Sequence, residues 1–589
     1  MAEIDDRQLA VYLLSKFFYP LHENRKQYED SWVTLRKRYI GYLEESSDEE
    51  EDWRAKLPDF LTFAFVQSMV AYMYEAFFGV KPYISVEIYE GHQIESEEER
   101  TRKLIEAALN KQFDEAQVAG KKGIMLFADA FLYGTSIARV FWRTEKKKRY
   151  YLANGEKKER EYTIYDGPDI KPISLFDFWI DPFTTLDQAK VVIVRNIINY
   201  DEFLALQESG YYRQVELASR RSTTSEEYQE SKALFIRADE SPVYQTDPDL
   251  VEILEIWIKS YGGELGKVYH IANREVVVRE EENPFWSQEL PFISFTPVPD
   301  SGKFYGLSAM WIARGAIDEL ITHKRLRLDN IKLSLYPMWK ARGNVNPEDL
   351  QVKMNGVIWC DTRADDVEPL RVPYASIGVA EEEQLLRDIM FITGFNEIMA
   401  GSIPRTSIFR TSLGASVFSQ LAFGRLGLMK LSLAEDISKL AYRFLEMDYQ
   451  YLSNPIVVEL FEPDGEKFVK IKMEVTPEIL TRANKLVPIA SLDPNRQIRK
   501  QQFLNLIQVA SALPQLAARL NEEAIWKELC YDFNFQNREI LLLKPPQAVM
   551  PQIQQTALQQ QQQTTVPEES DMIKELMRQI IQGGGLGEE

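Results

Sequence analysis

The sequence contains few of the residues that build disulfide frameworks or zinc sites. Only two cysteines, Cys360 and Cys530, occur among 589 residues, and they lie far apart in the chain. No two of the four histidines have the three- to five-residue spacing that many zinc sites use. The pattern therefore excludes a disulfide scaffold and a CxxC metal or redox pair, and it favours a reducing compartment.

Long apolar runs and a basic leader are also missing. No run of about 18 uncharged apolar residues is present, so no transmembrane helix is expected. The N-terminal segment MAEIDDRQLAVYLLSKFFYP is amphipathic and begins with acids, unlike a secretory signal peptide. We expect a protein that does not enter a membrane and is made in a cytoplasm.

The common signatures of hydrolytic and nucleotide chemistry are absent. There is no GxxxxGK[ST] phosphate loop, no GxSxG elbow and no GxGxxG motif after a strand. Asp361, Asp365 and Asp366 are acids of the kind that a nuclease metal site uses, but a solvated turn is the favoured interpretation of this stretch. We expect no catalytic residue, no metal and no cofactor. The alternative to a protein without catalytic activity is a DNA-processing enzyme, either a nuclease or a packaging ATPase.

Positive charge is in deficit. The chain has 69 Lys and Arg against 90 Asp and Glu, for a net charge of −21, which argues against holding nucleic acid by broad phosphate neutralisation. The basic run Lys146–Arg149 is a local exception. It lies in an expected hairpin with its turn at Asn154–Gly155 and alternates with glutamates. A solvated hairpin face is favoured over a nucleic-acid patch.

Enough apolar sequence is present for a large core, since 45% of the residues are hydrophobic and 12% are aromatic. Hydrophobic periodicity predicts an α+β, mainly helical protein. In the N-terminal half, helices are expected at 4–19 and 23–43 (separated by Pro20), at 58–78 and at 96–119. An apolar helix should end at Gly134, and strands are expected at 82–89, at 137–142, on both sides of a turn at Asp181–Pro182, and at 251–263, 267–282 and 291–299.

Helices dominate the stretch from Phe304 to about Leu452. A helix is expected at 307–335, supported by the i,i+4 ion pairs Arg314–Asp318 and Arg325–Asp329. Short strands should follow at 338–342 and 356–362. A second helix is expected at 379–392, and a very long one should run from Thr411 or Ser412 to about Leu452, with Gly424 and Gly427 as weak points.

The C-terminal part should begin with a hairpin that turns at Asp464–Gly465. Helices are then expected at 477–486, 494–512, 514–529 and 537–543. The tail from Lys544 is Gln-rich and of low complexity, so we expect it to be disordered.

Several stretches in the same order resemble one family. ADAFLYGTSIARVFW is similar to a helix-to-strand passage around a YGT, and SLFDFWIDPFTTLDQAK is similar to an aromatic-Asp-Pro segment. FTPVPDSGKFYGLSAMWIARGAIDEL resembles an FYG entry into a long helix. ITGFNEIMAGSIPRTS with TSLGASVFSQLAFGRLGL resembles a loop followed by the start of a longer helix. Together they resemble the portal, or head-to-tail connector, proteins of tailed bacteriophages, closest to those of short-tailed phages.

This resemblance implies a portal-type fold with a wing, long stem helices, a β-containing clip, a tunnel loop and a helical crown. The implied segments are a wing at 1–303, a first stem helix at 304–336, a clip at 337–378, a second stem helix at 379–392, a tunnel loop at 393–411, a long wing-crown helix and hairpin at 412–475, a crown at 476–543 and the tail at 544–589.

The resemblance also implies a function and partners. The chain would form a ring, expected to be a dodecamer, at one capsid vertex of a virion, as the channel for viral genome packaging and ejection. Its partners would be the terminase large subunit, a tail adaptor or head-completion protein, the major capsid and scaffolding proteins, and double-stranded DNA in the channel, with assembly in the cytoplasm of a bacterial host. A capsid or scaffold component that forms no ring is a further alternative.

Candidate contact residues follow from these segments. In the tunnel loop, DNA contacts are expected from Arg405, Arg410, Thr406 and Ser407. On the first stem helix, Lys324, Arg325 and Arg327 are candidates, with an ordinary exposed helix face as the alternative. In the clip, contacts with terminase or the adaptor are expected from Trp339, Lys340, Arg342, Asp361 and Arg363.

Overall fold

The chain forms two compact units in a computed structural model. One unit comprises Met1–Leu460 with Lys472–Arg499, and the other Phe461–Ile471 with Lys500–Glu589. The structure describes residues 5–43, 54–79, 81–87, 96–153, 156–217, 250–260, 265–336, 338–342, 366–369, 377–394, 412–464, 467–483 and 485–488. The helices expected at 494–512, 514–529 and 537–543, the strand expected at 356–362 and the tail lie outside these residues.

A continuous helical segment opens the described chain. It consists of α1 (Asp6–Leu13), a π-helical turn η1 (Leu14–Phe18) and α2 (Tyr19–Tyr39). The predicted break at Pro20 is therefore wrong. Pro20 lies in the first turn of α2, where a missing N–H is tolerated, and the wider π turn before it continues the helical path.

Three helices supply much of the main core: α3 (Leu61–Phe78), α4 (Ser96–Glu115) and α5 (Lys121–Tyr133). The expected apolar helix at 58–78 is confirmed, but it begins at Leu61, because the Asp59 carboxylate accepts hydrogen bonds from the N–H groups of Leu61 and Thr62. Gly134 ends α5 with φ +91°, as predicted from the sequence.

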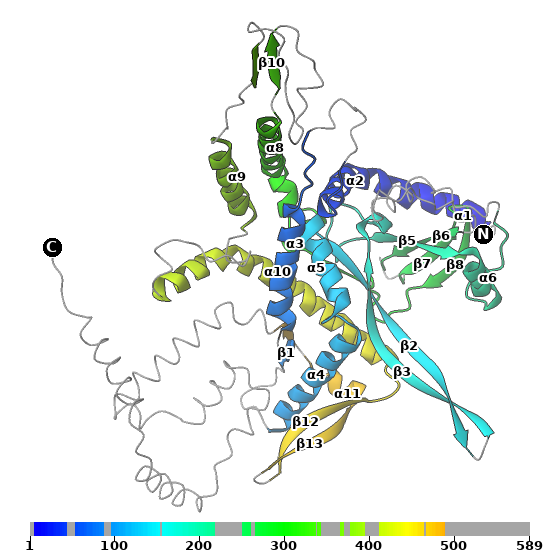
Figure 1. Cartoon of the computed structure of the whole chain (residues 1–589). Coiled ribbons are helices and arrows are strands. Elements are labelled where there is room, and N and C mark those ends of the chain that lie inside the picture. The colour runs from blue at the N-terminus through cyan, green and yellow to red at the C-terminus, as the bar shows by residue number, and fades with distance from the viewer. Residues whose placement is uncertain are drawn as a thin grey trace, which may run out of the picture. The chain divides into compact units, whose positions relative to one another are not determined.

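The expected strands form antiparallel sheets (Figure 1). The long hairpin β2 (Ser136–Ala153) and β3 (Glu156–Ile173) is extended by β9 (Phe292–Phe295). A five-stranded sheet has the order β4 (Phe178–Trp179), β5 (Val191–Asn199), β6 (Leu250–Ile258), β7 (Lys267–Ala272) and β8 (Val276–Glu282), with α6 (Tyr200–Glu208) after β5. These elements confirm the mixed α and β composition.

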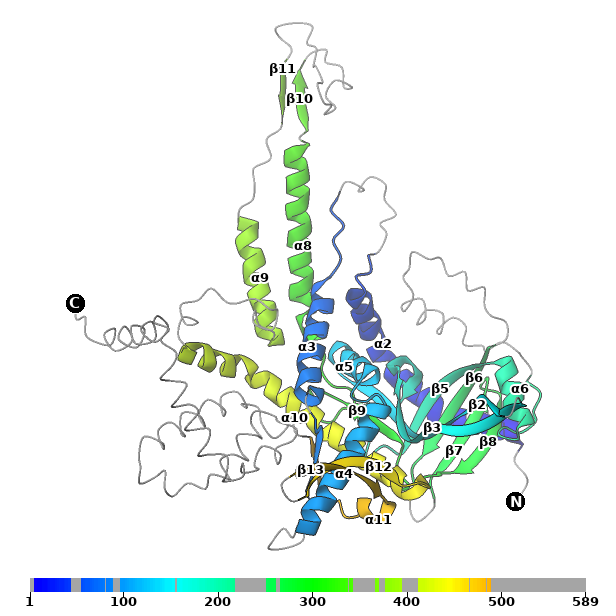
Figure 2. The same ribbon diagram turned by 60° about the horizontal axis from the view of Figure 1, so that its bottom comes forward.

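The long helices lie where expected, with slightly different bounds. They are α8 (Ala309–Leu335), α9 (Ile377–Thr393) and α10 (Ser412–Tyr451), and α10 continues through Gly424 and Gly427. Figures 1 and 2 show α8 and α9 side by side, with the hairpin of β10 (Trp339–Arg342) and β11 (Asp366–Pro369) beyond the C-terminal end of α8. None of the helices in the described ranges is long and apolar enough to cross a membrane.

The chain after α10 differs from its expected helical form. The predicted hairpin is present as β12 (Ile456–Asp464) and β13 (Lys467–Val475), but only Pro477–Leu480 of the expected 477–486 helix is helical, as α11. Lys485–Pro488 forms β14, which pairs with β1 (Ile84–Glu87). This long-range pairing outweighs the helical preference of a short segment.

Three of the four charged residues expected to pair along α8 contact other parts of the chain, and the fourth, Arg314, donates instead to the carbonyl of Trp311 in the same helix at 2.6 Å. Arg38 on α2 donates to Asp318 at 2.7 Å, and Arg325 donates to the carbonyl of Leu57 at 2.6 and 3.1 Å. Neither i,i+4 pair forms, because contacts between elements outweigh exposed pairs worth a few tenths of a kcal/mol. The predicted ion pairs Arg314–Asp318 and Arg325–Asp329 are therefore wrong.

A buried acid joins α10 to α4. Asp448 is fully buried, and its Oδ1 accepts a hydrogen bond from Nε2 of Gln112 at 2.8 Å. Burial raises the pKa of Asp448 to about 8, since the ionised carboxylate loses its hydration, and the bond from Gln112 offsets only part of this. The stability that this group contributes is complete below its unfolded pKa, about 4, and is lost as the pH rises through about 8.

Asp448→Asn should therefore stabilise the fold in a pH-dependent way. The amide keeps the shape and the acceptor for Gln112 but does not ionise, so we expect Tm to rise by about 4 °C or more at pH 8.5 and to change much less at pH 5. Scanning calorimetry at both pH values measures this. Glu435→Gln, at an exposed position of the same helix, is the control and should change Tm little at either pH. Equal shifts of Asp448→Asn at the two pH values would contradict the prediction.

Candidate functional site

The entry to α8 is built from segments that are far apart in the sequence. Gly306, just before α8, lies against Gly134, which ends α5. A Cβ atom on Gly306 would lie 2.6 Å from the carbonyl oxygen of Gly134, 2.7 Å from that of Val298 and 2.4 Å from Cγ2 of Thr296. Two backbones meet here at a distance that only glycine permits. We call this contact the glycine junction.

Hydrogen bonds fix the direction in which α8 leaves the junction. The N–H of Gly306 donates to Oγ1 of Thr135 at 2.8 Å. The buried Ser308 donates to the carbonyl of Leu132 at 2.7 Å and accepts from the N–H of Trp311 at 3.3 Å, so it caps α8 while bound to α5. The YGT and FYG segments therefore act as one structural unit.

Aromatic side chains fix the residues just before Gly306 at the entry to α8. The N–H of Phe304 donates to the carbonyl of Pro182 at 2.8 Å, and the Phe304 ring stacks on Phe178 with centroids 6.0 Å apart. Tyr305 is buried and packs edge-to-face on Trp32 of α2 at 5.1 Å. The aromatic-Asp-Pro segment thus also converges on the start of α8.

The long helix α10 is attached close to this place. Ser432 donates through its hydroxyl to the carbonyl of Thr296 at 2.7 Å, and the N–H of Thr296 donates to Asp436 at 3.0 Å. Ser432 and Asp436 are four residues apart and so share one face of α10. Burial raises the pKa of Asp436 to about 7, although the bond from Thr296 opposes the shift. Thr296, the residue directly after β9, therefore connects α10 to the sheet from which the chain continues into α8.

The three cations expected on the first stem helix all have partners in the same chain. Nζ of Lys324 lies 4.7 Å from the ring centroid of Phe60, and Arg325 binds the carbonyl of Leu57, as described above. Arg327 pairs with Glu382 of α9 at 2.7 Å. These contacts hold α8 to the segment before α3 and to α9. Their expected role in contacting DNA stays a prediction.

The clip and tunnel-loop residues are only partly described. Trp339 pairs with Pro369 across the β10–β11 hairpin, and the exposed Lys340 pairs with Glu368. Arg342 lies opposite Asp366. The remaining predicted site residues lie outside the described residues: Asp361, Arg363, Arg405, Thr406, Ser407 and Arg410.

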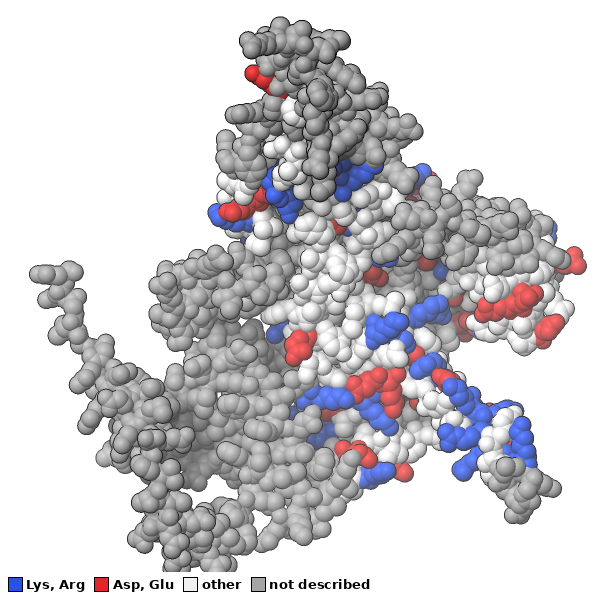
Figure 3. All heavy atoms as spheres, in the orientation of Figure 1, with Lys and Arg blue, Asp and Glu red and all other residues white. Residues whose placement is uncertain are grey.

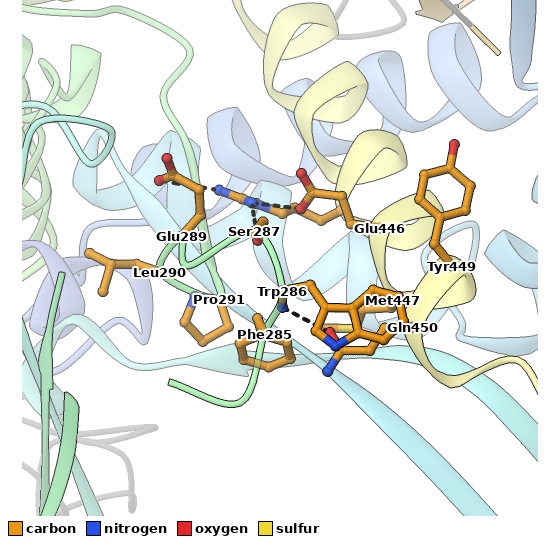
Figure 4. Close-up of a pocket in the computed structure, with 11 residues that line it drawn as sticks. Phe285, Trp286, Ser287, Glu289, Leu290, Pro291, Glu446, Met447, Tyr449 and Gln450 are labelled. Atoms are coloured by element: carbon orange, nitrogen blue, oxygen red, sulfur yellow. Dashed lines mark hydrogen bonds and ion pairs between the residues drawn. The ribbon is translucent and has the colours of Figure 1, made fainter. Parts of the chain in front are cut away.

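A cavity of about 280 Å³ lies between the segment around Trp286 and α10 (Figure 4). Arg443 pairs with Glu446 at 2.7 Å and with Glu289 at 3.7 Å, and the N–H of Trp286 donates to Gln450 at 3.0 Å. Two carboxylates thus offset the one cation, and no histidine or cysteine is among the lining residues. No group of three or more potential metal ligands occurs in the described part of the chain. We assign no chemistry to the cavity.

The sequence matches the model of one protein family, described as Phage SU10 portal protein, over residues 152–582. The chain belongs to this family. Portal proteins form the channel through which a phage genome is packaged, so the predicted family and function are confirmed. The family is structural rather than enzymatic. No curated protein matches the chain.

The matched range contains the aromatic-Asp-Pro and FYG segments and all of α8, α9 and α10. It begins after the YGT segment, whose contact with Gly306 comes from the structure alone. Sequence reasoning identified YGT and FYG as separate motifs and missed that they touch. The available signal was the glycine in each motif, since glycine is the residue that permits the close approach of two backbones.

The glycine junction predicts opposite effects for two substitutions of glycine by alanine. Gly306→Ala places a methyl group against backbone oxygens and should destabilise the protein by about 1–3 kcal/mol or more. Gly315→Ala lies in α8 with no atom within 4 Å of the new Cβ, and it should stabilise by about 0.5–1 kcal/mol. Denaturant unfolding of both variants measures this. Equal effects of the two substitutions would show that the junction is not tightly packed.

Proposed function

We propose that the chain assembles into a closed ring, a dodecamer, at one capsid vertex, and that α8 and α9 line its central channel. The observation that supports this proposal is the pairing of α8 with α9 through the ion pair Arg327–Glu382. The helix α8 begins at the glycine junction, and the β10–β11 hairpin follows its C-terminal end. In this proposal the wing is 1–303, the stem helices are 304–336 and 379–392, the clip is 337–378 and the tunnel loop is 393–411. The long helix and hairpin (412–475), the crown (476–543) and the tail (544–589) complete the chain.

The clip is the proposed docking point for partners. Trp339, Lys340, Arg342, Asp361 and Arg363 would contact the terminase large subunit during packaging and a tail adaptor or head-completion protein afterwards. Support comes from the placement of β10–β11 beyond the C-terminal end of α8, at a distance from the core sheets in both views (Figures 1 and 2). The major capsid and scaffolding proteins would contact the ring at the vertex.

Exposed apolar side chains on the helices support a contact between neighbouring subunits. Phe391 on α9 is 74% exposed, and Leu428 and Leu431 on one face of α10 are 70% and 52% exposed. Arg425 donates to the carbonyl of Phe391 at 2.6 Å and holds α9 against this part of α10. In a closed cyclic ring each subunit presents one surface to the next, and such side chains are the ones a neighbour would cover.

This contact predicts the effect of two acidic substitutions. Leu428→Asp with Leu431→Asp removes two leucines from the proposed interface and should raise the concentration needed for ring assembly about a hundredfold. Native mass spectrometry across a dilution series measures it. Phe183→Asp with Leu265→Asp, at positions of similar exposure outside the long helices, is the matched control and should leave assembly unchanged. Unchanged assembly of the Leu428 and Leu431 variant would remove this surface from the interface.

DNA in the channel would meet weak and sparse positive charge. Arg405 and Arg410, with Thr406 and Ser407, would make transient phosphate contacts from the tunnel loop, while Lys324, Arg325 and Arg327 would add positive potential from α8. A net charge of −21 disfavours tight retention of the duplex, which suits a channel through which DNA must slide. We propose no catalytic activity. Magnesium-dependent DNA cleavage or ATP hydrolysis by the purified protein would contradict this.

Arg405→Ala with Arg410→Ala should separate assembly from packaging. We expect rings of normal mass and a several-fold loss of packaged or retained DNA, since two phosphate contacts are removed without touching the helices. Packaging assays with purified proheads measure the second effect. Normal packaging by the double variant would exclude the two arginines from the mechanism.

A further inference from the structure

The β2–β3 hairpin separates its charges between its two faces. Directly opposed residues of an antiparallel pair share a face, and successive residues of one strand alternate between faces. The register pairs Lys147 with Tyr162, Arg149 with Arg160 and Tyr151 with Lys158. These six residues form one face, which we call the basic face. It has four cations, two tyrosines and no acid along these three pairs.

The opposite face of the same hairpin has mixed charge. Its pairs are Lys148 with Glu161, Tyr150 with Glu159, and Leu152 with Lys157, and Lys146 lies opposite Thr163. Lys148 and Glu159 form an ion pair at 2.7 Å, and Nζ of Lys157 lies 4.1 Å from the ring centroid of Tyr150. In sequence order the two faces are interleaved, so the run appeared to alternate with glutamates throughout.

The basic face lacks internal neutralisation. Within the described residues, no carboxylate lies within ion-pair distance of Arg149, Lys158 or Arg160, and Lys147 has only Glu145 at 3.6 Å. Arg149 and Arg160 lie directly opposite each other, an arrangement that costs the hairpin stability. Arg149 also lies 5.2 Å from the ring centroid of Tyr162. Figure 3 shows Lys and Arg dominating the hairpin in that view.

We propose that the basic face of the β2–β3 hairpin is a second DNA-binding surface, which contacts the phosphate backbone of double-stranded DNA outside the stem and tunnel loop. From Lys147 to Tyr151 the face is about 13 Å long, because a strand rises about 3.3 Å per residue. One strand of DNA places about four phosphates in that length. The four cations therefore match the charge that such a segment presents.

DNA fits this face better than an acidic protein surface does. The six residues include no aliphatic side chain and four of them are charged, whereas the core of a protein interface is depleted in charged residues. Tyrosine hydroxyls and arginine or lysine side chains are common partners of phosphate and sugar oxygens. Such contacts carry no base information, so binding should be independent of sequence and sensitive to salt.

The test compares two triple variants that remove the same charge from the two faces. Arg149→Gln, Lys158→Gln and Arg160→Gln alter the basic face, and Lys146→Gln, Lys148→Gln and Lys157→Gln alter the opposite face. Fluorescence anisotropy of a labelled 20-base-pair duplex, titrated with the full chain between 50 and 200 mM salt, gives the affinity and its salt dependence. We expect the first variant to bind about tenfold more weakly or worse, with a salt slope smaller by up to about 2.7, and the second to bind nearly as the parent does.

Every other outcome overturns the proposal. Equal losses in both variants would mean that only the total charge of the hairpin matters, and no loss in either would place DNA binding elsewhere. Failure of the basic-face variant to form rings, with unchanged DNA binding, would assign the face to a second copy of the chain. Ring assembly is measured separately by native mass spectrometry, so failure of the DNA surface is distinguishable from failure of the proposed ring.

Discussion

The close approach of two glycines, Gly134 and Gly306, sets the geometry on which the rest of the structure depends. At this point the end of α5 and the entry to α8 approach more closely than any side chain permits. Thr135 and Ser308 then fix the direction of α8 by hydrogen bonds to the facing segment. The position of a helix of 27 residues is therefore determined at one end by a contact between residues that are far apart in the sequence.

Charge on the long helices serves first to hold them in place. Arg325 and Arg327 bind a backbone carbonyl and a carboxylate of the same chain, and Asp436 binds the backbone of Thr296. The side chains that these helices leave exposed include large apolar ones, such as Phe391 and Leu428. In the described part of the chain, Arg149, Lys158 and Arg160 of the β2–β3 hairpin have no carboxylate within ion-pair distance. A subunit that must pack against neighbours and let DNA slide is consistent with this division.

Local patterns predicted the elements well, because periodicity, caps and glycine positions act over a few residues. The bounds of α8 and α10 and the end of α5 at Gly134 follow from such signals. Local rules failed where distant contacts decide. Pro20 is accommodated by a π turn, and Lys485–Pro488 becomes a strand because β1 offers it a partner.

The site was predictable only as separate motifs. YGT, the aromatic-Asp-Pro segment and FYG were each visible, but their convergence on one helix start depends on tertiary packing that a single sequence does not display. The two faces of the hairpin were hidden for a related reason. Strand register alone determines which lysines and glutamates share a side, and it divides a run that is mixed in sequence into one basic face and one mixed face.

The most direct test of the central claim is the position of α8 and α9 in the assembled protein. An electron cryo-microscopy map of the purified assembly would show it. A closed ring is predicted, with α8 and α9 around an open axial channel and the β10–β11 hairpin at one rim. A ring with these two helices at its outer edge, or a stable monomer that forms no ring, would contradict the account.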